Sequence, residues 1–133
     1  MHVTGFYAAL CALIALVLAL RVSLQRRTSQ VGVGHGGDAR LELRMRAFGN
    51  FAEYVPLALI LLLALELDHT RIWLLHLFGI VLVLARIAHA IGISATGGVS
   101  AGRFLGVLGT WAVLLVMALL LIWQHVAAWL IVG

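Results

Sequence analysis

Lysine is absent from this sequence, and acidic residues are scarce. All 9 basic residues are arginine, and aspartate and glutamate together number 5. Hydrophobic residues fill 64% of the 133 positions. A soluble domain of this length needs far more polar surface to cover one core. The shortage of polar side chains therefore excludes a soluble globular protein and indicates that lipid is the solvent.

The single cysteine, Cys11, excludes an internal disulfide and any cysteine-rich metal site. It lies in an uninterrupted apolar run, where cysteine usually serves as a small packing residue. That run lacks the preceding basic residues of a cleavable signal peptide, and Arg21, Arg26 and Arg27 follow it instead. We therefore expect the first apolar segment to be a retained signal-anchor helix.

Four apolar windows each approach the ~20 residues that an α-helix needs to cross a ~30 Å hydrocarbon layer. They cover residues 3–20, 47–65, 72–93 and 104–123. Asp38 precedes the second helix as a predicted N-cap. With their flanking signals, the windows predict helices at about 3–24, 38–66, 71–93 and 103–131. The predicted fold is all-α: a single integral membrane domain, residues 1–133, built as a four-transmembrane-helix bundle.

The arginines lie mostly at one end of the predicted bundle. Six flank or occupy the first connection and another ends the third: Arg21, Arg26, Arg27, Arg40, Arg44, Arg46 and Arg103. Cytoplasmic loops of membrane proteins carry an excess of such residues. We therefore expect connections one and three in the cytoplasm and both termini on the other side. This distribution explains the net charge of +4 without a nucleic-acid partner.

The segment RAFGNFAEYVP, residues 46–56, carries polar residues into one of the most apolar runs of the chain. Arg46, Asn50 and Glu53 stand at i, i+4 and i+7, which places them on one helical face, with Tyr54 beside the stripe. An ionised side chain at the centre of a membrane helix costs roughly 2.5–3.5 kcal/mol on insertion scales. Such residues therefore need a structural or functional reason.

Two polar pairs, distant in sequence, fall at matching depths. Glu53 lies 13 residues from Glu66 and Arg86 lies 13 residues from Trp73, which mark the non-cytoplasmic ends of their helices. At 1.5 Å per residue both are about 20 Å from that interface, and Asn50 and His89 are level with each other. Either Glu53 and Arg86 pair and hold the bundle together, or a polar pocket opens to the cytoplasm for a small ligand carrying negative charge. We favour the pocket, because the ion pair leaves the other polar residues unexplained.

The stretch RAFGNFAEYVPLAL closely resembles the second-helix signature of the membrane-associated proteins in eicosanoid and glutathione metabolism (MAPEG). That signature is an arginine and alanine, then asparagine, then glutamate three residues on, followed by tyrosine and proline. Chain length, helix number and motif position match too, so the resemblance covers the whole chain. The stretch LARIAHAIG is similar to the bacterial branch, which implies a multi-pass protein of the bacterial inner membrane.

The resemblance implies a homotrimer that binds glutathione between neighbouring subunits and uses it on a lipophilic small molecule. Arg103 corresponds most nearly to the arginine that faces the thiol, and Ser100 competes for that place because the third connection is longer than in eicosanoid-making members. No metal is implied. The residues implied in glutathione binding are Arg26 (or, in its place, Arg21), Arg46, Asn50, Glu53, Tyr54, Arg86 and His89.

The chemistry of these residues fits glutathione, which carries two carboxylates, one ammonium and one thiol. Arginine suits the carboxylates and Glu53 suits the ammonium. A nearby arginine lowers the thiol pKa from its ordinary value of about 8.5 and so creates the nucleophile. The resulting prediction is a membrane enzyme that conjugates glutathione to a lipophilic electrophile delivered by the lipid, or reduces it with glutathione.

His89 and Ile93 stand where eicosanoid-making members have tyrosines in the third helix, so eicosanoid synthesis is not carried over. Two other functions stay open. One is a non-catalytic membrane subunit or scaffold that retains a glutathione-like pocket. The other is a small proton-coupled transporter, although that class centres its glutamate in the first helix, and the first apolar window here contains no charge.

Overall fold

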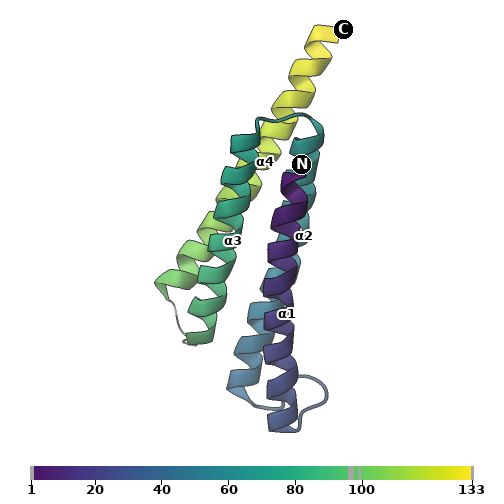
Figure 1. Ribbon diagram of the computed structural model, residues 1–133. Coiled ribbons are helices and arrows are strands. Elements are labelled where there is room, and N and C mark those ends of the chain that lie inside the picture. Colours follow the sequence, from purple (N-terminus) through teal and green to yellow (C-terminus); the bar gives the residue numbers. More distant parts are fainter. Residues whose placement is uncertain (1, 96–97, 99, 133) are drawn as a thin grey trace.

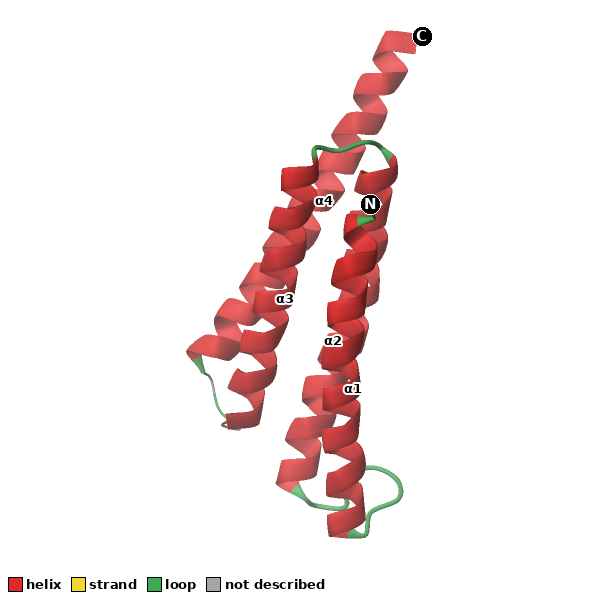
Figure 2. Cartoon of the chain, viewed as in Figure 1, coloured by secondary structure: helices red, strands yellow, loops and turns green. Residues whose placement is uncertain are grey.

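The structure, a computed structural model, describes residues 2–95, 98 and 100–132. It contains four helices: α1 (Val3–Ser29), α2 (Ala39–Leu67), α3 (Ile72–Ala95) and α4 (Ala101–Val132) (Figure 1). Loops join them, and the described residues contain no strand (Figure 2). Each helix is long and apolar enough to cross a membrane. The predicted all-α, four-helix transmembrane fold is confirmed.

The helix boundaries agree with the predicted ones within two residues, except that α1 continues to Ser29 rather than ending near residue 24. Arg26 accounts for the difference. Its Nη1 donates to the carbonyl oxygens of Gly32 and Gly34 at 3.2 and 3.0 Å, so its guanidinium holds the first connection against the last turn of α1. Gln30 then adopts a left-handed conformation (φ 54°), and its N–H donates to carbonyls of that turn and closes the helix.

α2 begins at the cap that the sequence predicts. Oδ1 of Asp38 accepts from the backbone N–H groups of Arg40 and Leu41 at 2.8 and 3.1 Å. Oδ2 of Asp38 accepts from the Ser29 hydroxyl, and from the Gln25 amide at 2.7 Å. These donors, the Ser29 hydroxyl foremost, hold the pKa of the Asp38 carboxyl well below its ordinary range. One carboxylate thus joins the end of α1 to the start of α2.

A second carboxylate fixes the opposite end of these two helices. Glu66, in the last turn of α2, accepts from the backbone N–H groups of Val3 and Thr4 at 2.7 and 2.8 Å. Nearby, the Tyr7 hydroxyl lies 2.9 Å from Nδ1 of His76 and ties α1 to α3. The start of α1 and the end of α2 therefore stand at one level, from which depth in the membrane can be counted.

Glycine lets α3 and α4 pack closely. A Cβ atom added to Gly106 of α4 would lie 2.6 Å from the carbonyl oxygen of Ala85 in α3. Small residues allow such close approach between membrane helices. α2 contacts each of the other three helices and so joins the α1–α2 hairpin to the α3–α4 hairpin. The start of α2, the end of α3 and the start of α4 lie at the same end of the molecule, where the two hairpins diverge (Figure 1).

The distribution of side chains is that of a membrane protein. Leu13, Leu16 and Ile60 point outward with more than 60% of their surface exposed, as residues that face lipid do. Arg86 is 2% exposed and lies in the interior. A charged side chain placed inside such a bundle, among polar partners, points to a functional site.

Candidate functional site

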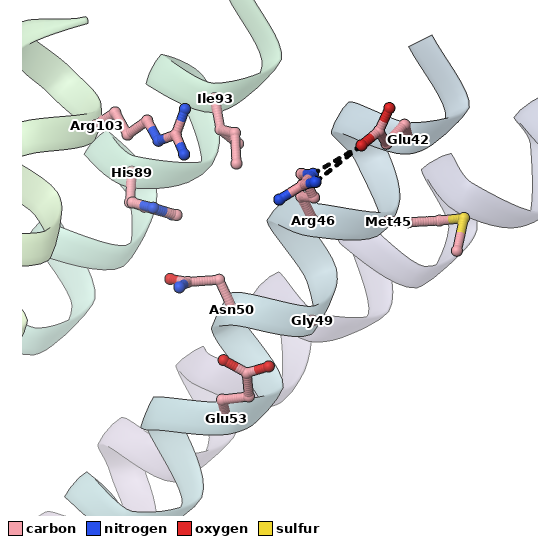
Figure 3. Close-up of a pocket in the computed structure, with 9 residues that line it drawn as sticks. All are labelled: Glu42, Met45, Arg46, Gly49, Asn50, Glu53, His89, Ile93 and Arg103. Atoms are coloured by element: carbon pink, nitrogen blue, oxygen red, sulfur yellow. Dashed lines mark hydrogen bonds and ion pairs between the residues drawn. The ribbon is translucent and has the colours of Figure 1, made fainter. Parts of the chain in front are cut away.

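A cavity of about 450 Å³ opens where the two hairpins diverge (Figure 3). α2 supplies one wall, and the end of α3 and the start of α4 supply the other. The volume falls within the ~300–1,000 Å³ typical of small-molecule sites. The lining residues are Glu42, Met45, Arg46, Gly49, Asn50, Glu53, His89, Ile93 and Arg103.

The wall on α2 is the polar stripe that the helical period predicts. Arg46, Asn50 and Glu53 follow one another along the face that borders the cavity (Figure 3). Arg46 is paired with Glu42, one turn earlier: its Nη2 and Nε lie 2.9 and 3.0 Å from Oε1 of Glu42. The two side chains are 63% and 40% exposed, so this pair contributes only about 0.2–1 kcal/mol. A better placed anion can displace Glu42 from Arg46.

The Glu53 carboxylate forms no hydrogen bond or ion pair within the part of the chain that the structure describes. It nevertheless lies about 20 Å from the level of Glu66, counted along α2, and so within the depth of the hydrocarbon layer. An unpaired carboxylate at such depth is costly unless it faces a water-filled cavity or a cationic partner. Glu53 borders the cavity, and a ligand there could supply the cation.

Arg86 lies behind the α2 wall and holds it in place. Its Nη1 donates to Oδ1 of Asn50 at 2.9 Å, and its Nη2 donates to the carbonyl oxygen of Gly106 at 3.1 Å. Its guanidinium carbon also lies 5.8 Å from the centre of the Tyr54 ring, a cation–π contact. The ion pair between Glu53 and Arg86, the alternative that the depths suggested, is not formed. Arg86 instead links α2, α3 and α4 and orients Asn50.

His89 and Arg103 face the polar stripe from the opposite wall (Figure 3). Asn50 and His89, which the residue count places level with each other, border the same cavity from opposite walls. The Arg103 side chain makes no hydrogen bond or ion pair within the described ranges. Arg103 also lines a second, apolar cavity of about 420 Å³ along α4, together with Phe104, Val107, Leu108 and Trp111. It thus stands at the junction of a charged cavity and an apolar one.

Residues 4–123, nearly the whole chain, match the MAPEG family. The chain belongs to the MAPEG family. It is also 34% identical over 121 residues to the inner membrane protein YecN of Escherichia coli strain K12, which covers 91% of each chain. The same protein from Escherichia coli O6:H1 strain CFT073 matches to the same extent. Both the family and this relative support a multi-pass protein of the membrane.

Four residues that the MAPEG resemblance implicates do not line the cavity of this single chain: Arg26, Tyr54, Arg86 and Ser100. Tyr54 contacts Arg86, as described above. The Ser100 hydroxyl donates to the carbonyl oxygen of Gly92 at 3.1 Å and accepts from the Arg103 backbone N–H at 3.3 Å. It therefore caps the N-terminus of α4. Arg26 holds the first connection. Of Arg103 and Ser100, Arg103 lines the cavity and Ser100 does not.

Sequence reasoning missed two polar or polarisable members of the MAPEG cavity, Glu42 and Met45. Glu42 stands four residues before Arg46 and so extends the same stripe by one turn. That spacing was the available signal. Met45, three residues after Glu42 and four before Gly49, lies on the same helical face, but an apolar side chain does not stand out in an apolar helix.

Proposed function

We propose that this protein is a glutathione-dependent membrane enzyme that attaches glutathione to a lipophilic electrophile, or reduces that electrophile with it. The observation that carries the proposal is the position of Arg103, on the wall shared by the charged cavity and the apolar cavity. Glutathione is water-soluble and charged, whereas the second substrate is apolar. A cation at the junction faces the place where a thiol and an apolar electrophile would meet.

The charges of the larger cavity complement those of glutathione. Arg46 matches a carboxylate and can exchange its exposed partner Glu42 for that ligand. Glu53, which is unpaired in the described chain, matches the ammonium group. Asn50 is held by Arg86 and presents an amide to the peptide backbone of the ligand. These contacts exist equally in the ground state and the transition state, so they serve binding.

In this proposal Arg103 is the catalytic residue. Glutathione supplies the thiol, and the guanidinium of Arg103 stabilises the thiolate form by its positive charge. The thiol proton passes to water in the charged cavity, and the sulfur forms a bond to an electrophilic carbon of a substrate in the apolar cavity. The electron pair of the bond that breaks departs with the leaving group or, for an epoxide, stays on the ring oxygen. His89 borders the same space and helps shape the end of the cavity nearest Arg103.

Glutathione binding to the detergent-solubilised protein tests the proposal most directly. We expect binding by calorimetry, weakened roughly ten- to a hundredfold by Arg46→Gln or Glu53→Gln, because each removes one charge-assisted contact. In turnover with a model electrophile, the same variants should raise KM for glutathione more than they lower kcat. A wild-type protein that binds no glutathione would refute the enzyme proposal, and binding without turnover would favour a scaffold.

Glu42→Gln is the matched control, since it also neutralises a charge in the same ion pair. It removes the competitor that occupies Arg46 in the unliganded chain. Glutathione should therefore bind up to about fivefold more tightly, the opposite sign to Arg46→Gln. Equal losses in the two variants would show that the ion pair supports the fold rather than competing with a ligand.

We propose that the charged cavity opens to the cytoplasm. The support is the excess of arginine at its end of the molecule, where α1 ends and α2 begins. Single cysteines at Gly36 and Gly98, in a Cys11→Ala background, should resist an impermeant thiol reagent added to intact cells. Both should react after the cells are opened. Rapid labelling in intact cells would reverse the orientation.

We also propose that the chain assembles as a homotrimer, as its family resemblance implies. The support is family membership, because the periodicity of the helices does not set a subunit number. Light scattering or native mass spectrometry in mild detergent should give three times 14.3 kDa of protein. A stable monomer or dimer that still binds glutathione would overturn the trimer while leaving the enzyme proposal intact.

A further inference from the structure

A small cavity of about 180 Å³ lies between α1 and α2, apart from the charged cavity, and three of its four lining residues are arginines. Arg21 comes from α1, and Arg40, Leu43 and Arg44 come from the first turns of α2. None of the four is implicated in contacting a thiol, and none lines the charged cavity. Three like charges around one small space repel one another unless an anion lies among them.

No acidic side chain of the described chain neutralises these arginines. The sole ion pair found there joins Glu42 to Arg46. Asp38, the nearest other carboxylate in sequence, uses both oxygens to accept from α1 side chains and from the first backbone N–H groups of α2. The cluster therefore lacks a partner within the chain.

The three guanidiniums differ in how they are held. Nη1 of Arg44 donates to the backbone carbonyl oxygen of Arg21 at 2.9 Å, which fixes Arg44 beside α1. The side chains of Arg21 and Arg40 form no hydrogen bond or ion pair within the residues that the structure describes. Their donors are free to bind a ligand. Guanidinium forks match the oxygens of a phosphate group in particular.

The cluster also lies at the depth of lipid headgroups. Glu66 binds the first N–H groups of α1, so distances along α1 and α2 can be counted from one level. Arg21 is 18 residues from Val3, or about 27 Å, and Arg44 is 22 residues from Glu66, or about 33 Å. The hydrocarbon layer is about 30 Å thick. These two arginines therefore bracket the boundary between acyl chains and headgroups.

Apolar side chains continue from the cluster along the outside of α1. Val17 lies four residues before Arg21, on the same helical face and toward the hydrocarbon layer, and Leu24 lies three residues after it, toward the headgroups. They are 57% and 50% exposed. An acyl chain can lie against the surface at Val17 while a phosphate occupies the arginine cavity. A free phosphate would use the arginines alone.

We propose that Arg21, Arg40 and Arg44 form a binding site for the phosphate of an anionic phospholipid. The site prefers a lipid whose headgroup carries net negative charge, such as phosphatidylglycerol, because a zwitterionic headgroup adds an ammonium that the arginines repel. It does not rest on the glutathione proposal, for which Arg21 was only the alternative to Arg26. Its role is to hold α1 and α2 at a fixed depth beside the mouth of the charged cavity.

The test uses the full chain, freed of lipid in a mild detergent, with phosphatidylglycerol added at increasing concentration. Native mass spectrometry and thermal unfolding should show binding about tenfold tighter than that of phosphatidylcholine. Arg21→Gln and Arg40→Gln should each abolish this preference, and both keep the Arg44 contact that joins the helices. Arg27→Gln, which removes the same charge from the last turn of α1 outside the cavity, should retain it.

Three outcomes would contradict the proposed phospholipid site. Equal binding of the two lipids, or equal losses in Arg27→Gln and Arg21→Gln, would show a general attraction of basic residues to the membrane. Full protection by inorganic phosphate at the concentration of the lipid would assign the cavity to a soluble anion. Arg21→Lys is a further test. It should bind phosphatidylglycerol better than Arg21→Gln but less well than the wild type, because lysine keeps the charge and loses the planar fork.

Discussion

Gly106→Ala is expected to destabilise the protein, although alanine is the better helix former. In an open helical position, replacing glycine by alanine gains about 1 kcal/mol. At Gly106 the new Cβ would lie 2.6 Å from the carbonyl oxygen of Ala85 and 2.7 Å from the backbone nitrogen of His89. Backbone atoms cannot turn aside as a side chain can. Forced separation of well-packed elements costs typically 1–3 kcal/mol, which equals or exceeds the gain.

The effect should reach the charged cavity as well. The carbonyl of Gly106 accepts from Arg86, whose other nitrogen holds Asn50. Moving α4 away from α3 loosens this link, so glutathione binding should weaken together with stability. A variant that lost stability but bound glutathione with full affinity would show that Arg86 does not orient the cavity wall.

Gly49→Ala is the matched control for this prediction. Gly49 also lies within a long membrane helix, but nothing is within 4 Å of the position of its Cβ atom. The substitution should therefore raise stability by roughly 0.5–1 kcal/mol. Thermal unfolding of both variants in the same detergent measures the difference. Equal shifts of Tm would show that the contact between α3 and α4 is not tight.

Arg103→Ala is expected to lower kcat about tenfold at neutral pH and to move the activity profile to higher pH. If Arg103 lowers the pKa of bound glutathione by one unit, its contact with the thiolate contributes about 1.4 kcal/mol. Without the cation the thiol pKa rises, so a smaller fraction is thiolate at neutral pH. Activity should then recover as the pH is raised through the new pKa.

The ultraviolet absorbance of the bound thiolate gives a measurement that does not depend on turnover. It should fall in Arg103→Ala at neutral pH and return at alkaline pH. Ser100→Ala is the control, because the Ser100 hydroxyl accepts from the Arg103 backbone N–H at the start of α4. That variant should lose some stability and keep the pH profile. If the pH profile of activity shifted only in Ser100→Ala, Ser100 rather than Arg103 would be the residue that acts on the thiolate.

The sequence predicted the helices because each apolar run matches the thickness of a bilayer, and it predicted the α2 wall because Arg46, Asn50 and Glu53 share a helical period. It placed the end of α1 too early. Hydropathy falls at the first arginine, but the helix continues as long as its backbone groups are satisfied, and Arg26 closes it against the loop.

The partner of Arg86 could not be read from depth alone. Counting residues puts Arg86 level with Glu53, yet an arginine side chain reaches across a full helical turn, and here it reaches Asn50. The sequence also could not predict that two cavities meet at Arg103. It depends on how far the two hairpins diverge, which the period of a single helix does not report.

The wall that the two cavities share at Arg103 has a consequence for measuring this protein under its proposed function. One reactant would arrive from water and the other from lipid, so neither would have to leave its own solvent. The rate would then depend on the mole fraction of the apolar reactant in the bilayer rather than on its concentration in the whole sample. Adding inert lipid would dilute that reactant and raise its apparent KM, with no change in the protein.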